Sequence, residues 1–322
     1  MILVVGGAGY IGSHMVKRLL EAKREVVTLD NLSTGHRFLI SGGEVIQGDL
    51  GDRVLLDNLF TTYSIRTVMH FAAFSLVGES VTNPLKYYEN NICRTINLVQ
   101  TMIKHNIKEF IFSSTAAAYG EPQTIPITED TRTAPLNPYG RSKLAVEQIL
   151  QDCGTAYGLR YMLLRYFNAA GADESGTIGE KHNPETHLIP LVLKTAKGER
   201  DNITIFGTDY PTPDGTCVRD YIHVSDLAEA HMLALQALER GEHSDVYNLC
   251  NNRGYSVREV IETSKKVTNM EIPVIEGPRR AGDPAVLIAS SDKIRRHLGW
   301  QPRYPDLETI IRSAWTWENN NL

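Results

Sequence analysis

Short runs of apolar, often β-branched residues alternate along the chain with longer segments in which apolar residues recur at helical spacing. Runs as short as these are typical of parallel strands buried on both faces. The alternation predicts βαβ units, and so an α/β fold with a doubly wound parallel sheet of the Rossmann type and a ligand crevice at the carboxyl ends of its strands. The expected strands are 2–5, 25–29, 44–48, 67–72, 109–114 and 160–166, and the expected helices 10–22, 53–62, 83–105 and 138–153.

The pattern changes near residue 172. From about 172 to 200 the chain is rich in Gly, Asp, Glu, Asn and Pro, which indicates a long surface segment that enters a second lobe. We therefore expect a first domain over 1–171 and a smaller, mixed α/β substrate lobe over 172–322, with part of 218–250 returning to the first domain. The lobe's expected strands lie near 203–206 and 246–249, and its helices near 225–240, 256–268 and 305–318.

Composition and charge exclude several classes of protein. Of 322 residues, 42% are hydrophobic and 22% charged, which is ordinary for a folded domain, and the net charge of -5 argues against nucleic-acid binding. An apolar window long enough to span a membrane is not found, and the opening MILVVGGAGYIG does not have the form of a secretory signal. The cysteines lack C-x-x-C or Cys/His ligand spacing, so we expect neither a disulfide framework nor a metal site. Free cysteines suit a reducing compartment, so we expect a cytoplasmic protein. The four cysteines are Cys93, Cys153, Cys217 and Cys250.

A glycine-rich turn joins the first strand to the first helix. Gly6, Gly9 and Gly12 allow a tight turn whose backbone amides approach a pyrophosphate. Asp30 ends the second strand, where a carboxylate binds the adenosine ribose hydroxyls and repels a 2'-phosphate, so NAD is favoured over NADP. The alternative is a structural turn with a capping aspartate that binds nothing. Asp49, after the third strand, either holds the adenine edge or caps the next helix.

The stretch NPYGRSK carries a possible proton-transfer pair. Asn137 suits an N-cap and Pro138 a first helical position, so Tyr139 and Lys143 lie on one helix face at i and i+4. An ammonium beside a phenol stabilises phenolate and lowers the pKa of the phenol, which would make tyrosine a competent base. Chance alone produces Y-x-x-x-K often, so the position of this pair after a dinucleotide motif matters more than the pattern.

The fifth strand ends in FSSTAAAYG, which puts Ser113, Ser114 and Thr115 at the carboxyl edge of the sheet. A hydroxyl there could bond both a substrate oxygen and the phenol. Serine and threonine at strand ends are otherwise common turn residues.

Together these motifs resemble the extended short-chain dehydrogenase/reductase superfamily, and within it the UDP-glucose 4-epimerase family. The narrower resemblance is carried by HFAAFSLVGES at 70–80, PLKYYENN at 84–91, LLRYFNAAGA at 163–172, FGTDYPTPDGTCVRDYIHV at 206–224 and RRAGD at 279–283. It implies a bound NAD, a UDP-hexose substrate and a homodimer. It also implies that Tyr139 takes the proton of the sugar 4-hydroxyl while C4 gives a hydride to NAD, after which the keto sugar turns and is reduced on its other face.

The resemblance also assigns binding residues. On the cofactor side it implies Tyr10 and Ile11 at the phosphates, Asn31 with Asp30 at the ribose, Leu50 with Asp49 at adenine, then Phe71, Ala72, Ala73, Asn91 and Phe167, with Lys143 at the nicotinamide ribose. On the substrate side, beside Thr115 and Tyr139, it implies Asn168, His187, Leu188, Phe206, Arg219, Arg280, Asp283 and Leu287, the two arginines holding the phosphates.

The chain departs from the family pattern at a few positions. Ser75 replaces a common lysine near the cofactor phosphates, His187 a common asparagine, and Thr115 a common serine whose hydroxyl it keeps. Leu287 stands where a larger or smaller residue decides whether an N-acetyl group fits, so activity on UDP-glucose and UDP-galactose is expected and N-acetylated sugars stay open.

Two other functions fit the same fold. A nucleotide-sugar 4,6-dehydratase needs an acid and a base beside the strand-end hydroxyl, but Ala116 and Ala117 occupy those places, and a related decarboxylase is disfavoured for a similar reason. A non-catalytic NAD-binding sensor would not need Tyr139, Lys143 and Thr115.

Overall fold

Two units, interleaved in sequence, make up the chain in the computed structural model, which describes residues 1–280 and 283–320. The first comprises Met1–Glu121, Arg132–Tyr166 and Ala228–Tyr247, and the second Pro122–Thr131, Phe167–Leu227 and Asn248–Leu322. The expected boundary after residue 171 differs from this division. Residues 167–171 belong to the second unit because strand β7 (Asn168–Ala170) pairs with β9 (Val218–His223) there. Residues 122–131, also expected in the first domain, belong to the second unit too. The returning segment lies inside the expected range 218–250.

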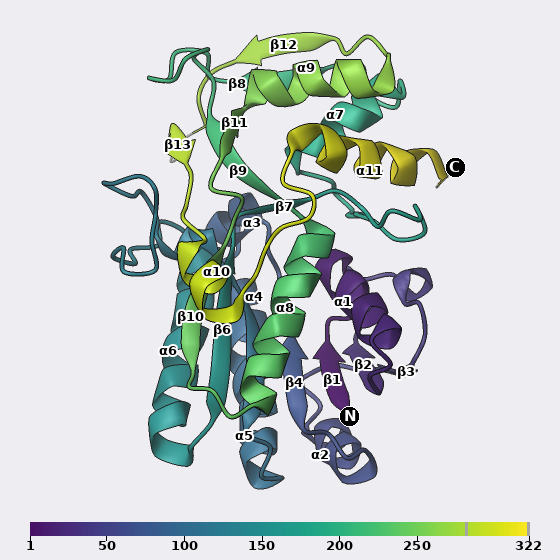
Figure 1. The fold of residues 1–322 in the computed structure, drawn as a ribbon, viewed down its shortest axis with the longest axis vertical. Helices are drawn as coiled ribbons and strands as arrows, with labels where there is room; N and C mark the ends of the chain where they lie inside the picture. Colours follow the sequence, from purple (N-terminus) through teal and green to yellow (C-terminus); the bar gives the residue numbers. More distant parts are fainter. Residues whose placement is uncertain (281–282, 321–322) are drawn as a thin grey trace. The chain divides into compact units, whose positions relative to one another are not determined.

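A seven-stranded sheet forms the centre of the first unit, in the order β10-β6-β5-β4-β1-β2-β3 (Figure 1). All neighbours from β3 to β6 pair in parallel, so the chain moves outward in both directions from β1, as in a doubly wound sheet. The fold expected from the apolar runs is confirmed. The strands are β1 (Ile2–Val5), β2 (Val26–Asp30), β3 (Glu44–Gln47), β4 (Thr67–His70), β5 (Glu109–Thr115), β6 (Arg160–Tyr166) and β10 (Asp245–Leu249).

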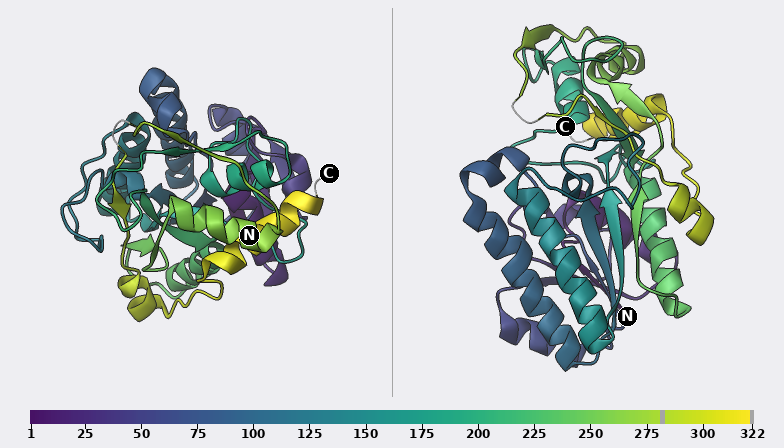
Figure 2. Two further views of the ribbon diagram at one scale, coloured as in Figure 1. Left: turned by 90° about the horizontal axis from the view of Figure 1, so that it is seen from above. Right: turned by 90° about the vertical axis from the view of Figure 1, so that its left-hand side faces the viewer.

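Helices cover both faces of this sheet, as the right-hand view of Figure 2 shows. Helices α2 (Arg53–Thr62), α5 (Arg94–Lys104) and α6 (Pro138–Tyr157) share one apolar core with the sheet. Helices α1 (Tyr10–Glu21) and α8 (Val224–Glu239) lie together, joined by an ion pair of 2.8 Å between Arg18 and Glu229.

The helix expected over 83–105 is present over residues 84–104, with a π-helical turn inside it. It consists of α4 (Pro84–Tyr88), a π-helical turn over Glu89–Cys93, and α5. The short helix α3 (Val77–Thr82) precedes it and was not expected. Helix α6 continues past its expected end at residue 153 until Gly158 adopts the left-handed conformation, with φ of 69°.

Two small sheets and four helices make up most of the described second unit. Strands β7 (Asn168–Ala170), β9 (Val218–His223), β11 (Gly254–Ser256) and β13 (Val286–Leu287) form one sheet, and β8 (Ile203–Phe206) pairs with β12 (Val274–Gly277). The helices are α7 (Leu188–Ala196), α9 (Val257–Thr268), α10 (Asp292–Leu298) and α11 (Leu307–Asn320).

The expectation that 172–200 is a surface segment was partly wrong. Helix α7 lies inside it and buries Ile189, Val192 and Leu193 against α9 and β8. The apolar spacing of these three residues is helical, but the polar residues before Leu188 mask it in a longer window. Over the residues that the structure describes, none of the helices combines the length and apolar character needed to cross a membrane.

Candidate active site

In the loop after β1, each of the three glycines has a different structural environment. Gly6 has φ of 81°, and a Cβ there would lie 2.5 Å from the backbone nitrogen of Ala72. A Cβ on Gly12 would lie 2.1 Å from the carbonyl oxygen of Gly6, so α1 can pack on the loop only with glycine. Gly9 would meet only an ordinary contact of 3.4 Å, so the chain itself does not require glycine there. An open Gly9 at the N-terminus of α1 fits the approach of a phosphate to uncapped amides.

Asp30 fixes the loop from the next strand. One carboxylate oxygen accepts a hydrogen bond of 2.9 Å from the backbone nitrogen of Ala8, and the other accepts one of 2.8 Å from Leu32. The carboxylate is buried at the carboxyl end of β2, beside the turn that would hold a pyrophosphate. This is the arrangement that a ribose-binding acid requires, because each oxygen still has a second acceptor site.

Asp49 is held close to the second strand. Its carboxylate accepts hydrogen bonds from Asn31 (2.7 Å) and from the backbone nitrogen of Gly51 (2.7 Å), and pairs with Arg94. The structure decides the alternative that Asp49 caps helix α2, because Asp52 caps it instead, accepting from the first-turn amides. Three candidates for the adenosine end of NAD, Asp30, Asn31 and Asp49, thus lie together.

Thr115 and Tyr139 are brought together at the carboxyl end of β5. Helix α6 begins as expected, with Asn137 accepting a hydrogen bond of 2.8 Å from Gly140 and Pro138 in the first turn. The side chain of Thr115 hydrogen-bonds the phenol of Tyr139 and also accepts from the backbone nitrogen of Ala117 at 3.1 Å. Two hydroxyls therefore stand side by side at the edge where a parallel sheet binds ligands.

Lys143 lies beneath these hydroxyls in a buried position. Its Nζ donates to the carbonyl oxygen of Ser113 at 2.8 Å and sits 4.7 Å from the centre of the Phe112 ring. Burial lowers the pKa of Lys143 to about 7, against the opposing charge of Glu147. Burial also raises the pKa of Tyr139, and the hydrogen bond from Thr115 lowers it only in part. The expectation that Lys143 lowers the pKa of the Tyr139 phenol is therefore not met in the protein without cofactor. Burial disfavours both the phenolate of Tyr139 and the ammonium of Lys143.

A second set of hydrogen-bonded side chains at this edge was not predicted from the sequence. The phenol of Tyr166, at the end of β6, hydrogen-bonds the Ser113 side chain and Nε2 of His231 in α8. The His231 ring packs against Phe71 with 4.9 Å between ring centres. His231 comes from the segment that returns late in the chain, so local spacing gave no signal for it.

Asn91 supports the loop after β4. Its amide donates to the carbonyl oxygen of Phe74 and to Ser142, and accepts from the backbone nitrogen of Phe74, each at 3.0 Å. With its amide engaged in this way, Asn91 is better suited to positioning the expected lining residues Ala72 and Ala73 than to direct cofactor contact. It lies in the π-helical turn, a distortion frequent at functional sites. The remaining cofactor candidates are Tyr10 and Ile11 in the first turn of α1, Leu50, which is buried, and Phe167, which begins a stretch of the second unit.

The second unit carries the candidates for nucleotide binding. Arg219 in β9 pairs with Asp283 and donates to the carbonyl oxygen of Val218 at 2.8 Å. Leu287 in β13 is the register partner of Arg219. The Arg280 guanidinium lies 3.9 Å from the centre of the Phe206 ring. Asn168 donates to the carbonyl oxygen of Asp220 at 2.9 Å, and in the RRAGD motif residues 281–282 lie outside the described residues.

His187 and Leu188 begin helix α7, His187 as its N-cap. Nδ1 of His187 lies 2.8 Å from a carboxylate oxygen of Glu180 and 3.0 Å from one of Glu185. These carboxylates outweigh burial and raise the pKa of His187 to about 10 and of the neighbouring His182 to about 9. Cysteine spacing gives no sign of this group, whose pattern in the sequence is E-x-H-x-x-E-x-H over residues 180–187.

The glycine loop, the candidate ribose-binding acid Asp30 and the Tyr139–Thr115 pair are the arrangement expected in a dinucleotide-dependent enzyme that moves protons and hydride at a carbon bearing a hydroxyl. Residues 2–250 match the NAD dependent epimerase/dehydratase family, and the chain belongs to this family. NAD is accordingly its cofactor, and the residues of the glycine loop and Asp30 fit it.

Three similar proteins cover nearly the whole chain. A UDP-glucose 4-epimerase of Halalkalibacterium halodurans is 56% identical over 99% of this chain and 96% of its own. The structure of UDP-glucose 4-epimerase from Bifidobacterium longum in complex with NAD+ and UDP has a TM-score of 0.95 at 41% identity, covering 99% and 98%. The UDP-Glc/GlcNAc 4-epimerase of Campylobacter jejuni has a TM-score of 0.87 at 46% identity, covering 99% of each chain.

Proposed function

We propose that this enzyme interconverts UDP-glucose and UDP-galactose by inverting the configuration at C4 of the hexose. The observation that carries the proposal is the contact between the Thr115 and Tyr139 side chains at the carboxyl end of β5, in a chain 56% identical to a UDP-glucose 4-epimerase over nearly its whole length. A sensor that only bound NAD would have no use for this hydroxyl pair.

Each residue of the pair has a role in this proposal. Tyr139 accepts the proton of the sugar 4-hydroxyl and later returns it, while Thr115 holds the same oxygen in place. When bound, NAD supplies the hydride acceptor that takes the C4 hydrogen and gives it back. Lys143 would hold the nicotinamide ribose, and the positive charge of an oxidised nicotinamide would oppose the effect of burial, which raises the pKa of the Tyr139 phenol.

Binding through the nucleotide leaves the sugar free to turn. A hexose that must present both faces can have no fixed contacts of its own, so the UDP portion has to supply the binding energy. Arg219 and Arg280 supply cations for the diphosphate, with Asn168, Leu188, Phe206 and Asp283 as further contacts. Because Arg219 already pairs with Asp283, the guanidinium is oriented before the nucleotide arrives.

The dehydratase alternative is disfavoured by the residues after Thr115. Ala116 and Ala117 form a short 3-10 turn directly beyond the strand end and carry only methyl groups. Elimination of water needs a proton donor and acceptor near this place.

A wider substrate range is a second candidate. Leu287 pairs in register with Arg219 and is smaller than an aromatic residue, and the similar Campylobacter jejuni protein is a UDP-Glc/GlcNAc 4-epimerase. We infer that UDP-N-acetylglucosamine is also accepted. An absence of its conversion, under conditions in which UDP-glucose turns over, would contradict this inference.

We further infer a homodimer in the cytoplasm. Helices α5 and α6 are candidates for the dimer contact. A reducing compartment agrees with four free cysteines, of which Cys217 and Cys250 are buried. Sedimentation of the purified protein tests the dimer.

Two measurements on purified protein test the proposed reaction. Heat denaturation is expected to release about one NAD per chain, and UDP-galactose is expected to give UDP-glucose without added cofactor. Formation of a dehydrated keto sugar instead would support the dehydratase, and bound NAD without any conversion would support the sensor.

A further inference from the structure

Two glutamates and two histidines of the second unit converge on one point. Glu180, His182, Glu185 and His187, here called the Glu–His cluster, each offer one donor atom, and these atoms all lie within 4.8 Å of one another. All four residues come from one short stretch ahead of α7. Two imidazole nitrogens with two carboxylate oxygens are a mixed donor set that suits zinc-type ions.

The spacing of these donors is that of a small coordination sphere. Nδ1 of His182 lies 3.1 Å from Oε1 of Glu180 and 3.6 Å from Oε2 of Glu185. Nδ1 of His187 lies 2.8 Å from the same Glu180 oxygen and 3.0 Å from the other Glu185 oxygen, Oε1. In a tetrahedral zinc site with bonds of about 2.0–2.1 Å, neighbouring donors are separated by about 3.3 Å. The four nitrogen–oxygen distances bracket this value. Small side-chain rotations would therefore complete the site.

The backbone around the cluster is fixed from outside it. The carbonyl oxygen of Glu180 accepts a hydrogen bond of 2.9 Å from the indole of Trp317 in α11. A Cβ at the adjacent Gly179 would lie 2.4 Å from the Trp317 ring, so this packing needs glycine. A Glu185 oxygen accepts from the backbone nitrogens of Thr186 and His187, at 2.7 and 2.8 Å. The donors are thus held in place before any ion binds, which reduces the ordering cost of binding.

An ion-pair cluster without metal is the competing explanation. Each imidazole, when protonated, can pair with the carboxylates that flank it. That explanation balances two positive rings, whose centres are 5.1 Å apart, with two carboxylates, so a metal ion has to displace two protons in order to bind. One divalent ion would satisfy all four groups at a single centre.

We propose that the Glu–His cluster binds one divalent transition-metal ion of the zinc type, through Nδ1 of both histidines and one oxygen of each glutamate. The ion fixes the segment that leads into helix α7. It takes no part in the proton transfer proposed for Tyr139. Because His187 was also expected on the substrate side, the variants that test the ion are made at His182 and Glu185, which have no role in the proposed reaction.

Zinc titration of the full-length protein tests the site directly. Untagged protein, treated with a chelator and then freed of it, is titrated with ZnCl₂ in a calorimeter and scanned for thermal unfolding. One zinc per chain and a higher Tm are expected. His182→Gln should weaken binding by about 100-fold or more, since even outer-shell changes cost about 10–100-fold. His243→Gln, which changes an exposed histidine, is the matched control and should bind as the unaltered chain does.

Cobalt spectra identify the donors without any variant. Co²⁺ in the unaltered protein is expected to give the intense visible bands of a four-coordinate nitrogen–oxygen site. A near-ultraviolet sulfur-to-cobalt band would place the ion on a cysteine such as the exposed Cys93 and would overturn the proposal. So would binding that is unchanged in both His182→Gln and Glu185→Gln, or no stoichiometric zinc binding at all. Far-ultraviolet circular dichroism and NAD content confirm that each variant is folded.

Discussion

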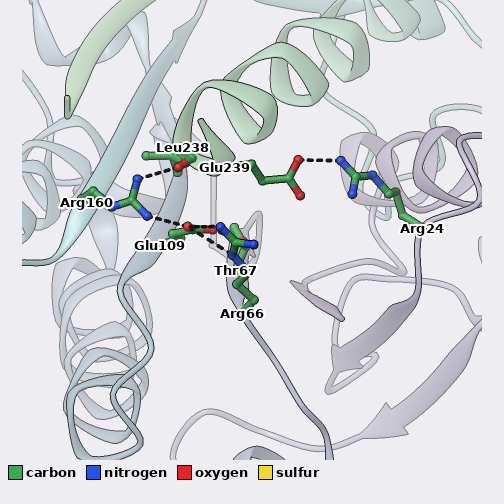
Figure 3. Close-up of polar contacts among 7 residues, drawn as sticks. All are labelled: Arg24, Arg66, Thr67, Glu109, Arg160, Leu238 and Glu239. Carbon is green, nitrogen blue, oxygen red and sulfur yellow. Dashed lines mark hydrogen bonds and ion pairs between the residues drawn. The ribbon is translucent and has the colours of Figure 1, made fainter. Parts of the chain in front are cut away.

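The buried charged groups Glu109 and Lys143, which lie near opposite ends of strand β5, differ in whether partners inside the protein satisfy them. At the amino end, Glu109 begins β5 and is buried (Figure 3). Its carboxylate accepts from the Thr67 hydroxyl at 2.6 Å and from Arg160 at 2.6 Å, with Arg66 at 3.4 Å. Arg160 also donates to the carbonyl oxygen of Leu238 near the end of α8, at 2.5 Å. The charge at this end is thus compensated within the protein.

Near the carboxyl end of the same strand Arg165 pairs with the buried Glu147, but the compensation of Lys143 is incomplete. Lys143 is almost fully buried, yet its amine contacts a main-chain carbonyl and an aromatic ring rather than a paired carboxylate, and its pKa falls to about 7. The phenol of Tyr139 has a raised pKa despite its bond to Thr115. Groups with such shifted pKa values, gathered at one edge of a sheet, are typical of sites that complete their interactions with a ligand.

The comparison separates polar residues that stabilise the fold from the candidates for the proposed reaction. Both sets are buried, and both include charged groups at the ends of β5. The difference lies in whether partners inside the protein satisfy them. A substitution at the amino end should therefore change stability, and one at the carboxyl end should change turnover.

The largest effect is expected for Tyr139→Phe. Removal of the phenolic oxygen takes away the proposed proton acceptor, and general acid–base catalysis contributes about 10²–10⁴-fold. We expect kcat for UDP-galactose to fall by about that factor, with NAD content and Tm unchanged. Initial rates of UDP-glucose formation measure it.

Tyr157→Phe is the matched control, because Tyr157 is 53% exposed at the far end of the same helix. It should leave kcat within about twofold. A Tyr139→Phe enzyme with the rate of this control would remove Tyr139 from the proposed mechanism.

A smaller effect, on stability alone, is expected for Glu109→Gln. Hydrogen bonds to charged groups contribute roughly 1.5–3 kcal/mol, and the amide leaves Arg160 without its charged partner, so the free energy of unfolding should fall by about 2–3 kcal/mol. Urea unfolding measures this change, and kcat should stay the same.

The control for Glu109 is Glu21→Gln, in an exposed i,i+4 pair with Lys17 at 3.9 Å. Exposed pairs contribute about 0.5 kcal/mol or less. If Glu109→Gln cost no more than this control, or reduced kcat, the division between the two ends of the sheet would be wrong.

Local sequence was sufficient to predict the features that depend on neighbouring residues. The apolar runs located β1 to β6, and Asn137 with Pro138 located the start of α6 to the residue. The contact between Thr115 and Tyr139 followed from parallel topology, because strand ends and the loops after them meet at one edge.

Features that depend on distant residues could not be predicted in this way. His231 reaches Tyr166 across 65 positions, and Arg160 reaches Leu238 across 78. The pKa of Tyr139 was expected to fall because Lys143 is near in sequence, but the sign of the shift is set by burial, which the tertiary packing determines. The residues of the Glu–His cluster are close in sequence, but only the spacing of histidine and glutamate, not that of cysteine, indicates them.

The pH dependence of stability tests the state of Lys143. Its pKa is about 7 in the folded chain and near 10.5 when unfolded, so between these values the unfolded chain binds more protons. The free energy of unfolding should therefore rise with pH above 7, by about 1–2 kcal/mol between pH 7.5 and 9. Urea unfolding of NAD-free protein measures the rise.

Lys143→Met supplies the reference for this measurement, since other groups also titrate in the same range. The rise attributed to Lys143 is the difference between the unaltered chain and the variant. If the free energy of unfolding rose equally with pH in the unaltered chain and in Lys143→Met, the lysine would keep its proton in the folded state. Its burial would then be compensated inside the protein.

The smallest effect is expected for Thr115→Ser, which keeps the hydroxyl and removes a methyl group. If the hydroxyl alone matters at the carboxyl end of β5, kcat of this variant should stay within about threefold of the unaltered enzyme. Thr115→Val keeps the shape but loses the hydroxyl. It should lower kcat by about tenfold or more, as expected for the loss of one hydrogen bond of about 1.5 kcal/mol. The valine variant should also raise the pKa of Tyr139 further, because the bond that lowers it is gone. A pH–rate profile for Thr115→Val whose rising, acidic limb moves to higher pH would show that the threonine acts through the phenol, because a proton acceptor works only when it is deprotonated. An equal loss in the serine and valine variants would show instead that packing of the methyl group, rather than the hydroxyl, positions the site.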